Sequence, residues 1–268
     1  MLGSKVKEIA MDLAIMQIIY QRVLILMRVT GLFIITPFYG SRTIPTRIRL
    51  GLALLITFIL GNVLSNNNLE LPSNLIYLTF DMLTEFSIGL VLGLIALLIF
   101  VSIQLAGQFM DMRMGFALAN VMDPQNGNPS ALTGQFKNIL ATLLFLVING
   151  HHHLLQALDK SFLIIPLTKA ELSNALFMKL LKIIGQLFPL AFKIALPLVA
   201  VLFLTDIAFG LVARAVPQIN IFVVGLPTKI LVGILLLSLT MPIYISLLKE
   251  LFRDMFINMN DIINILGS

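Results

Sequence analysis

Hydrophobic residues occur along this chain in long runs separated by short polar turns, a pattern typical of helices buried in a membrane. The runs predict about six helical segments, and the third, which begins near Leu75, is the longest. Its uncharged stretch, Phe86 to Met110, spans roughly 37 Å at helical rise, which is enough to cross a bilayer with tilt. The expected bounds of the other segments are Leu13–Ile35, Arg47–Leu64, Leu132–Leu158, Leu176–Val216 and Ile230–Phe256.

Proline and glycine positions add detail to this pattern. Pro189 and Pro197 fall in the fifth segment and Pro242 in the sixth. Because proline removes a backbone donor, we expect these helices to be kinked or broken. Gly89 and Gly93 form a G-x-x-x-G step in the third segment, which either lets another helix approach closely or is an accident of spacing. The expected fold is an all-α membrane protein of about six long, kinked helices.

Composition places the chain among integral membrane proteins. Hydrophobic residues make up 59% of the 268 and charged residues 12%, and the mean hydropathy is +1.00, far from the balance of a soluble domain. The net charge of +5 suits a protein beside anionic lipid, and no basic run indicates a nucleic-acid partner. Polar residues interrupt the first apolar run and no A-x-A-like cleavage site follows, so we expect the first helix to be retained.

Lysine and arginine positions do not fit a simple series of membrane crossings. Arg42, Arg47 and Arg49 place the turn before the second segment in the cytoplasm, and no Lys or Arg follows until Arg113. If every later segment crossed the bilayer, the connection at 159–182 would lie outside, although it holds four lysines. We interpret the conflict to mean that some segments are hairpins packed against protein. The four lysines are Lys160, Lys169, Lys179 and Lys182.

Four ionisable residues lie inside apolar stretches, where facing lipid would cost several kcal/mol for each side chain. They must therefore face protein or water. Two interpretations remain open, an ion or proton pathway and polar contacts at buried helix or subunit interfaces. The four residues are Lys193, Asp206, Arg214 and Lys229.

A stretch that begins at Gly107 combines glycine, methionine and phenylalanine between two apolar segments, and we expect it to form a loop that serves as a gate or plug. Methionine fills irregular gaps and releases them at small cost, and glycine gives the backbone freedom to swing aside. Asp111 and Arg113 are expected to face water or to pair with neighbouring subunits. An ordinary surface loop in a Met-rich protein is the alternative. The candidate residues are Gly107, Phe109, Met110, Asp111, Met112, Arg113, Met114, Gly115 and Phe116, with Met122 further along.

The adjacent residues His151, His152 and His153 raise the question of a metal site. Consecutive helical residues point about 100° apart, so three neighbours do not converge on one ion, and Asp159 is about two turns away. Hydrogen bonding at a helix end is the favoured interpretation. The chain has no cysteine, and no nucleophile-elbow, phosphate-loop or zinc-protease motif is present. We therefore expect no enzyme activity, no metal and no cofactor.

An ordered set of motifs runs along residues 15–255. In chain order they are R-V-T-G-L-F…P-F at 28–38, I-P-x-x-x-R at 44–49, E-F-S-I-G-x-x-x-G at 85–93, A-G-Q-F-M-D-M-R-M-G at 106–115, D-P at 123–124, N-G-H-H at 149–152, S-F…P at 161–166 and R-A-V-P-Q-I-N-I-F-V-V-G-L-P-T-K at 214–229. No single motif is decisive, but their order is specific, and the set resembles the FliR family.

This resemblance implies a function and a set of partners. FliR-like proteins form part of the export gate of the flagellar type III secretion system and are similar to the SctT subunits of injectisomes. One copy of this chain would then assemble with several FliP-like and FliQ-like subunits into a helical cone, and a FlhB-like subunit is a further expected partner. Lipid and unfolded exported proteins in transit are further expected partners. The expected location is the bacterial inner membrane, at the flagellar basal body.

The resemblance also implies roles for parts of the chain. Residues 106–124 match the family's plug, which narrows the pore in the closed state. Residues 1–131 are expected to be built like the P-type subunit, extending into the next helix, and the end of residues 132–268 like the Q-type subunit, as hairpins in the assembly. Expected subunit contacts are Glu85, Gly89, Gly93, Lys193, Asp206, Arg214, Asn220 and Lys229.

Two other functions compete with that of an export-gate subunit. One is a multi-pass solute or ion transporter that uses Lys193, Asp206 and Arg214, and the other is an intramembrane enzyme that uses the histidine run. Transporters often contain internal repeats of similar hydropathy, and the two halves of this sequence show no clear one. An export-gate subunit should depend on its partners in detergent, whereas a transporter should be stable and bind its solute alone.

Overall fold

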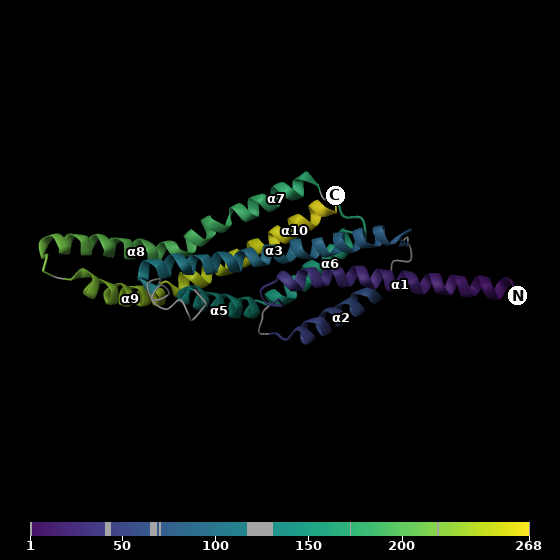
Figure 1. The fold of residues 1–268 in the computed structure, drawn as a ribbon, viewed down its shortest axis with the longest axis horizontal. Coiled ribbons are helices and arrows are strands. Elements are labelled where there is room, and N and C mark those ends of the chain that lie inside the picture. The colour runs from purple at the N-terminus through teal and green to yellow at the C-terminus, as the bar shows by residue number, and fades with distance from the viewer. Residues whose placement is uncertain are drawn as a thin grey trace. The chain divides into compact units, whose positions relative to one another are not determined.

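The computed structural model describes residues 2–40, 44–64, 69, 71–116, 131–171, 173–218 and 220–267. These residues contain helices and no strand, so the all-α class is confirmed. In chain order the helices are α1 (Leu2–Ile35), α2 (Thr46–Val63), α3 (Leu75–Met114), α5 (Leu132–Val147), α6 (Gly150–Ile164), α7 (Asn174–Gly185), α8 (Leu187–Ala215), α9 (Ile221–Leu239) and α10 (Met241–Leu266) (Figure 1).

Several of the described helices are long and apolar enough to cross a membrane. Four stretches qualify, namely α1 from Met11, α2, α3, and α7 with α8. The bent pairs α5–α6 and α9–α10 raise the number to six if each pair is one span, which confirms the expected six apolar segments. The start expected for the last segment is wrong, because α9 begins at Ile221 and continues through Pro227.

Helix breaks occur close to the expected prolines but not at them. The α7–α8 break lies at Gln186 and the α9–α10 break at Thr240. Pro189 and Pro242 follow in the first turns of α8 and α10, where a missing N–H leaves no helical bond unmade. Pro197 lies inside α8, and the helix continues past it. Proline therefore starts two of these helices rather than kinking them in the middle.

Asn149 breaks the expected fourth helix into α5 and α6. Its φ is 57°, in the left-handed region that asparagine tolerates better than most residues. Gly150 follows, and a Cβ there would collide with the ring of Phe145. The expectation of one continuous helix is thus wrong, although the N-G pair that ends α5 was visible in the sequence.

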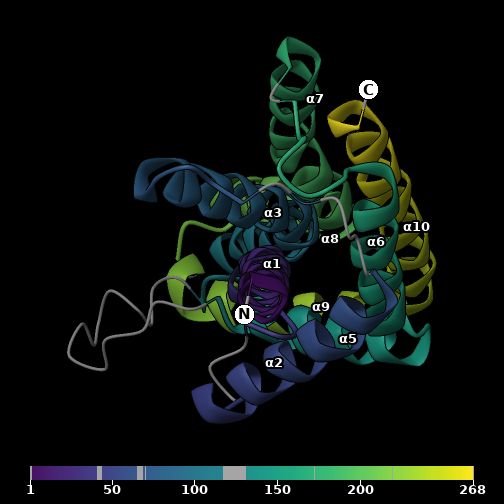
Figure 2. The same ribbon diagram turned by 90° about the vertical axis from the view of Figure 1, so that its right-hand side faces the viewer.

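The chain divides into two compact units by its internal contacts. Unit 1 consists of Met1–Leu97, His151–Leu180 and Met255–Ser268. Within it α2 lies beside α1 (Figure 2). Buried apolar residues recur at helical spacing along the helices of this unit, so one apolar face of each helix points into the core. The core residues include Leu24, Ile25, Leu32 and Phe33 of α1, Ile88, Leu92 and Ile95 of α3, Leu154 and Leu158 of α6, and Met259, Ile262 and Ile263 of α10.

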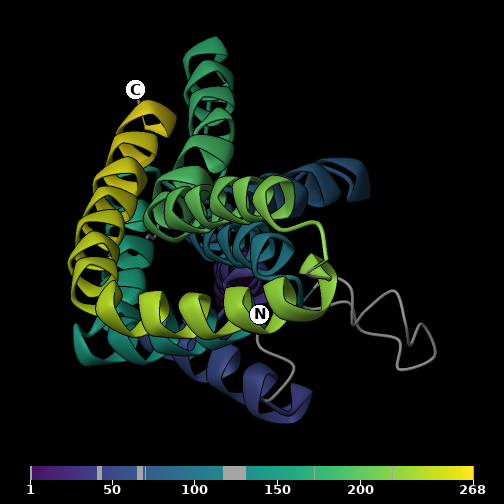
Figure 3. The same ribbon diagram turned by 90° about the vertical axis from the view of Figure 1, so that its left-hand side faces the viewer.

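Unit 2 consists of Leu98–Gly150 and Leu181–Asp254. Three aromatic rings meet in its core, with centroids 6.0 Å apart for Phe100 and Phe145, and 5.3 Å apart for Phe145 and Phe252. Helices α8 and α9 lie side by side in this unit (Figure 3). The inner face of α8 is made of Ala191, Ile194, Ala195, Leu198 and Leu202.

Aromatic contacts fix the turn that follows α1 in unit 1. The rings of Phe33 and Tyr39 stack with centroids 4.3 Å apart, and the Tyr39 hydroxyl donates to the carbonyl of His151 at 3.2 Å. Burial raises the pKa of Tyr39 to about 12. The hydroxyl therefore remains protonated, and remains a donor, at neutral pH.

The left-handed position at Asn149 leads to a stability prediction. Replacing Asn149 by Val should destabilise the purified protein by roughly 1–2 kcal/mol, because a β-branched residue is strained at positive φ. Replacing it by Gly should leave stability near that of the parent, since glycine adopts this conformation without strain. The thermal unfolding midpoint of the protein co-purified with its expected partner subunits measures both. A valine variant as stable as the glycine variant would contradict the left-handed conformation of residue 149 between α5 and α6.

Candidate functional site

The segment expected to be a loop from Gly107 is the end of α3, which stays helical as far as Met114. Gly115 then ends the helix with a φ of 90°, and its N–H donates to the carbonyl of Asp111 at 3.1 Å. The expectation of a loop from Gly107 is therefore wrong. Gly107 serves a helix contact rather than a turn, and the sequence pattern does not distinguish these two uses of glycine.

Burial separates the methionines of the expected plug. Met110 and Met114 are 1% and 0% exposed, so they have fixed packing positions, contrary to the expectation of a freely deforming seal. Met112, by contrast, is 67% exposed. Residues 117–124, including Met122, lie outside the described residues. Of the other candidates, Phe109, Gly115 and Phe116 are half-buried, Arg113 is exposed, and Gly107 and Asp111 are buried.

Helix α9 holds the end of α3 within unit 2. The Met114 side chain lies against Gly233, where a Cβ would collide with its thioether. One residue later, Gly115 faces Leu226. Both contacts come from the stretch 221–239, which the hydrophobic pattern only partly recognised as helix. The last turn of α3 is therefore held by a side chain in a glycine notch.

Asp111 caps the start of α5. The helix begins after Ala131, which makes no side-chain capping bond of its own. Instead, both carboxylate oxygens of Asp111 lie 3.2 Å from the backbone N–H of Thr133, and the Thr133 hydroxyl also donates to this carboxylate. Asp111 and Thr133 are buried, with 4% and 2% of their surface exposed. The expectation that Asp111 faces water or another subunit is not what this chain shows.

A glycine pair lies one turn from this cap. A Cβ on Gly107 would overlap the backbone of Gly134, so α3 and α5 touch backbone to backbone. Residues 107 and 111 are four apart and share one face of α3. The end of α3 and the start of α5 are thus held together at two points.

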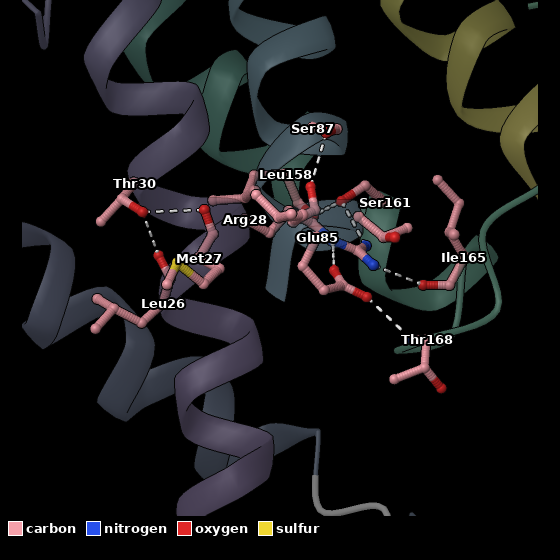
Figure 4. A network of polar contacts seen from close by, with 12 residues as sticks. Leu26, Met27, Arg28, Thr30, Glu85, Ser87, Leu158, Ser161, Ile165 and Thr168 are labelled. Carbon is pink, nitrogen blue, oxygen red and sulfur yellow. Dashed lines mark hydrogen bonds and ion pairs between the residues drawn. The ribbon is translucent and has the colours of Figure 1, made fainter. Parts of the chain in front are cut away.

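Arg28 and Glu85 form a second buried polar cluster, in unit 1 (Figure 4). Both side chains are fully buried, and Arg28 Nε lies 2.6 Å from Glu85 Oε2. The guanidinium also donates to Ser161 Oγ and to the carbonyl of Ile165, each at 3.2 Å. The pair therefore joins α1 to α3 and to the end of α6.

Two further contacts complete this cluster. The backbone N–H of Thr168 donates to Glu85 Oε1 at 3.0 Å, which fixes a residue with a φ of 68°. The Phe162 ring lies 4.2 Å from the Arg28 guanidinium carbon, in cation–π geometry. Arg28 was not among the expected site residues, although an arginine inside an apolar helix is a signal for a buried polar partner.

The three α3 residues expected at subunit contacts are used inside the chain. Glu85 forms the buried ion pair with Arg28, and Gly89 and Gly93 face α1. A Cβ on Gly89 would collide with the carbonyl of Arg28, and one on Gly93 would crowd Leu32. The G-x-x-x-G step does let another helix approach closely, and that helix is α1 of the same chain.

Asp206 of α8 and Lys229 of α9 form a partly exposed ion pair. Lys193 and Arg214 of α8 are exposed, and no carboxylate of the described residues lies within ion-pair distance of either. At helical rise, Lys193 and Asp206 are about 20 Å apart along α8, and Asp206 and Arg214 about 12 Å. The three residues of the transporter hypothesis therefore do not converge. Asn220 is exposed just before α9.

The histidines pack at the start of α6. The His151 ring lies 6.0 Å from that of Phe38, and the His153 ring 5.0 Å from that of Phe256. His153 Nδ1 lies 3.0 Å from Gln156 Oε1. Within the described stretches, no group of three or more His, Cys, Asp and Glu residues has the arrangement of a metal site.

Comparison with known proteins gives one consistent result. The sequence matches the model of a family described as bacterial export proteins, family 1, over residues 19–255. The flagellar biosynthetic protein FliR of Bacillus subtilis (strain 168) is 36% identical over 250 residues, covering 91% of this chain and 95% of the relative. The protein of the same description from Escherichia coli (strain K12) is 32% identical over 239 residues, covering 89% and 91%. That of Aquifex aeolicus is 28% identical over 229 residues, covering 85% and 88%.

The buried Arg28–Glu85 pair generates a prediction about stability. Arg28→Met should destabilise the protein by about 3–5 kcal/mol, because it leaves the Glu85 charge buried without its partner. Adding Glu85→Leu should recover most of that loss, since no charge then remains buried. Thermal unfolding of the protein co-purified with its expected partner subunits reports both changes. Arg22→Met is the matched control, because Arg22 of α1 bonds Asn62 at an exposed site and should matter little. If the single variant is no less stable than the double variant, the buried Glu85 charge does not need Arg28 as its partner.

Proposed function

Because the chain belongs to the FliR family of bacterial export proteins, we propose that it is a core subunit of the flagellar type III protein export gate. In this role it helps to form and to plug the polypeptide-conducting pore in the inner membrane, at the flagellar basal body. The family match over residues 19–255 carries the proposal. The paired helix ends at Asp111 and Thr133 support the gating part of it.

The gate segment, which we define as residues 107–124, has side chains suited to sealing a protein-conducting pore. A closed gate must exclude ions yet admit an unfolded polypeptide, so its seal needs apolar bulk that gives way without disrupting the core. Met112 is exposed and apolar, and Phe116 is half-buried beyond the end of α3. Met110 and Met114, which are buried, anchor the segment to unit 2 instead. The exposed Met112 is free to change conformation, whereas the buried Met110 and Met114 are fixed by packing. This arrangement supports a plug that moves while its base stays in place.

The exposed apolar helices support dependence on partner subunits. In the most apolar stretch of each candidate membrane span, 17% of α2 and 28% of α7–α8 are buried within the chain, whereas 56% of α3 is buried. Lys193 and Arg214 lie on the exposed face of α8, where lipid alone would be unfavourable. FliP-like, FliQ-like and FlhB-like subunits are the partners proposed to cover these surfaces, with lipid around them and unfolded exported proteins in transit.

The proposed assembly includes a division of the chain. Residues 1–131 are proposed to be built like the P-type subunit, extending into the next helix, and the end of residues 132–268 like the Q-type subunit. Their helices would then continue the cone formed by those subunits as hairpins. The chain acts in this proposal as a structural and gating subunit, without a catalytic site.

Dependence on partners is testable by expression. The chain expressed alone should aggregate or degrade in detergent, because its exposed apolar faces and the charges of α8 have no protein to cover them. Co-expression with P-type and Q-type subunits should yield a stable complex that contains it. Size-exclusion chromatography with and without the partners measures the difference. A monodisperse, long-lived monomer would count against the proposal.

Gating is testable by removing exposed apolar bulk from the gate segment. Replacing Met112 and Phe116 together by Ala should let ions or small dyes leak through the assembled complex, because the seal loses volume while the buried anchors remain. The complex reconstituted in vesicles, or dye uptake by cells that contain it, reports the leak. Complexes in which residues 110–114 are deleted, or in which Phe109 and Met110 are changed to Gly, should leak more strongly. These changes also disturb the core, because Met110 and Met114 are buried.

A matched control exists in α7, where Phe177 and Met178 are 60% and 66% exposed. Replacing these two by Ala removes the same kind of side chains from an exposed helical surface and should leave the membrane tight. Co-purification of all subunits shows that each variant assembles. An assembled Met112 and Phe116 variant as tight as this control would refute the plug assignment.

A further inference from the structure

We propose that Asp111 is a positioning residue of the gate, and that its bond to the start of α5 is the latch that holds the closed segment at its base. The inference rests on the proposed function, since it concerns the closed state of that gate. Asp111 is argued to act through α3 and α5 rather than by contact with an exported chain. The latch is defined as the Asp111 carboxylate and the backbone N–H and hydroxyl of Thr133.

The latch supplies what α5 lacks at its first turn. A helix start leaves backbone N–H groups without partners, and a side chain just ahead of the helix usually accepts from the second or third of them. Ala131 has no side-chain acceptor for this purpose, and the first turn of α5 contains no acidic residue. Thr133 is the second residue of α5, so the carboxylate from α3 occupies the position of the missing cap.

The negative charge of Asp111 adds to the bond. No cation of the described residues forms an ion pair with it, so the positive end of α5 is the group that balances its charge. The site is almost completely shielded from water, which strengthens a charge-assisted bond and makes its loss costly. A carboxylate is therefore preferred here over a neutral acceptor.

Position explains why this bond matters for a gate. Asp111 and Thr133 are 22 residues apart in the chain, and Asp111 lies inside the gate segment. With the latch present, the end of α3 is tied to the start of α5. Without it, the first turn of α5 loses its cap and frays. The Gly107–Gly134 contact and the Met114 notch remain, so the helices still pack and the subunit still assembles.

The first test compares variants in the complex co-expressed with its P-type and Q-type subunits and reconstituted in vesicles. Asp111→Ala should raise ion leakage on the order of tenfold, as expected for the loss of one buried helix cap. Asp111→Asn keeps an acceptor without the charge and should leak less. Thr133→Ser keeps both donors and should match the parent. Asp254→Ala is the control, because this acid is exposed in unit 2 and its ion pair within the described residues is with its neighbour Arg253, at 3.8 Å.

A second test replaces the latch by a reversible covalent bond. The chain contains no cysteine, so a pair introduced by Asp111→Cys and Thr133→Cys has no competing thiol in this subunit. The complex should leak when reduced and become tight when oxidised. A merely structural loss at residue 111 would not be reversed by an oxidant. A pair that forms no disulfide, or whose disulfide does not restore tightness, overturns the latch.

The outcomes separate failure of the latch from failure of the gate. If the Met112 and Phe116 double variant leaks and Asp111→Ala is tight, the gate stands and the latch is wrong. If both variants are tight, the plug assignment in the proposed function fails and the latch fails with it. If Asp111→Ala no longer co-purifies while Asp254→Ala does, Asp111 serves assembly rather than gating, and the proposal is overturned.

Discussion

Unpaired backbone groups at helix ends are the constraint on which the rest of this structure depends. Few of the residues are charged, and an unpaired N–H or C=O away from water is costly. In unit 1 the Arg28 cation donates to the carbonyl of Ile165, directly after α6 ends, and in unit 2 the Asp111 anion accepts from the start of α5. Each sign complements the dipole of the helix end that it meets.

Glycine brings these charges within reach of their targets. Gly107 precedes Asp111 by four residues and Gly89 follows Glu85 by four, so in both places an acid and a glycine share one face of α3. The glycine lets the facing helix approach to backbone contact, and the acid one turn away then meets a partner on or beside that helix. The two units therefore use the same local pattern, with Arg28 as partner in one and the start of α5 in the other.

The sequence predicted what depends on local pattern and missed what depends on distant partners. The apolar segments and the Gly89–Gly93 step follow from spacing along one helix, and the structure confirms them. The break at Asn149 also had a local signal. By contrast, the Arg28–Ser161 bond joins residues 133 apart, and nothing near either residue identifies the other. The sequence also did not predict that α3 continues past Gly107. Gly107 packs against Gly134 of α5, which is 27 residues away in the chain, so no local pattern indicates the contact.

The distribution of lysines takes a different meaning once the helices are known. The positive-inside rule counts charges in connections, and the stretch 159–182 appeared to hold four. In the structure Lys160 belongs to α6, and Lys179 and Lys182 belong to α7, so only Lys169 lies in the connection. Lys160 donates to Asn260 at 3.1 Å and Lys179 pairs with Asp261 at 2.7 Å, both on α10. Lys160 and Lys179 are thus side chains of packed helices within unit 1. The conflict with a simple count of crossings follows from counting such helix lysines as loop charges.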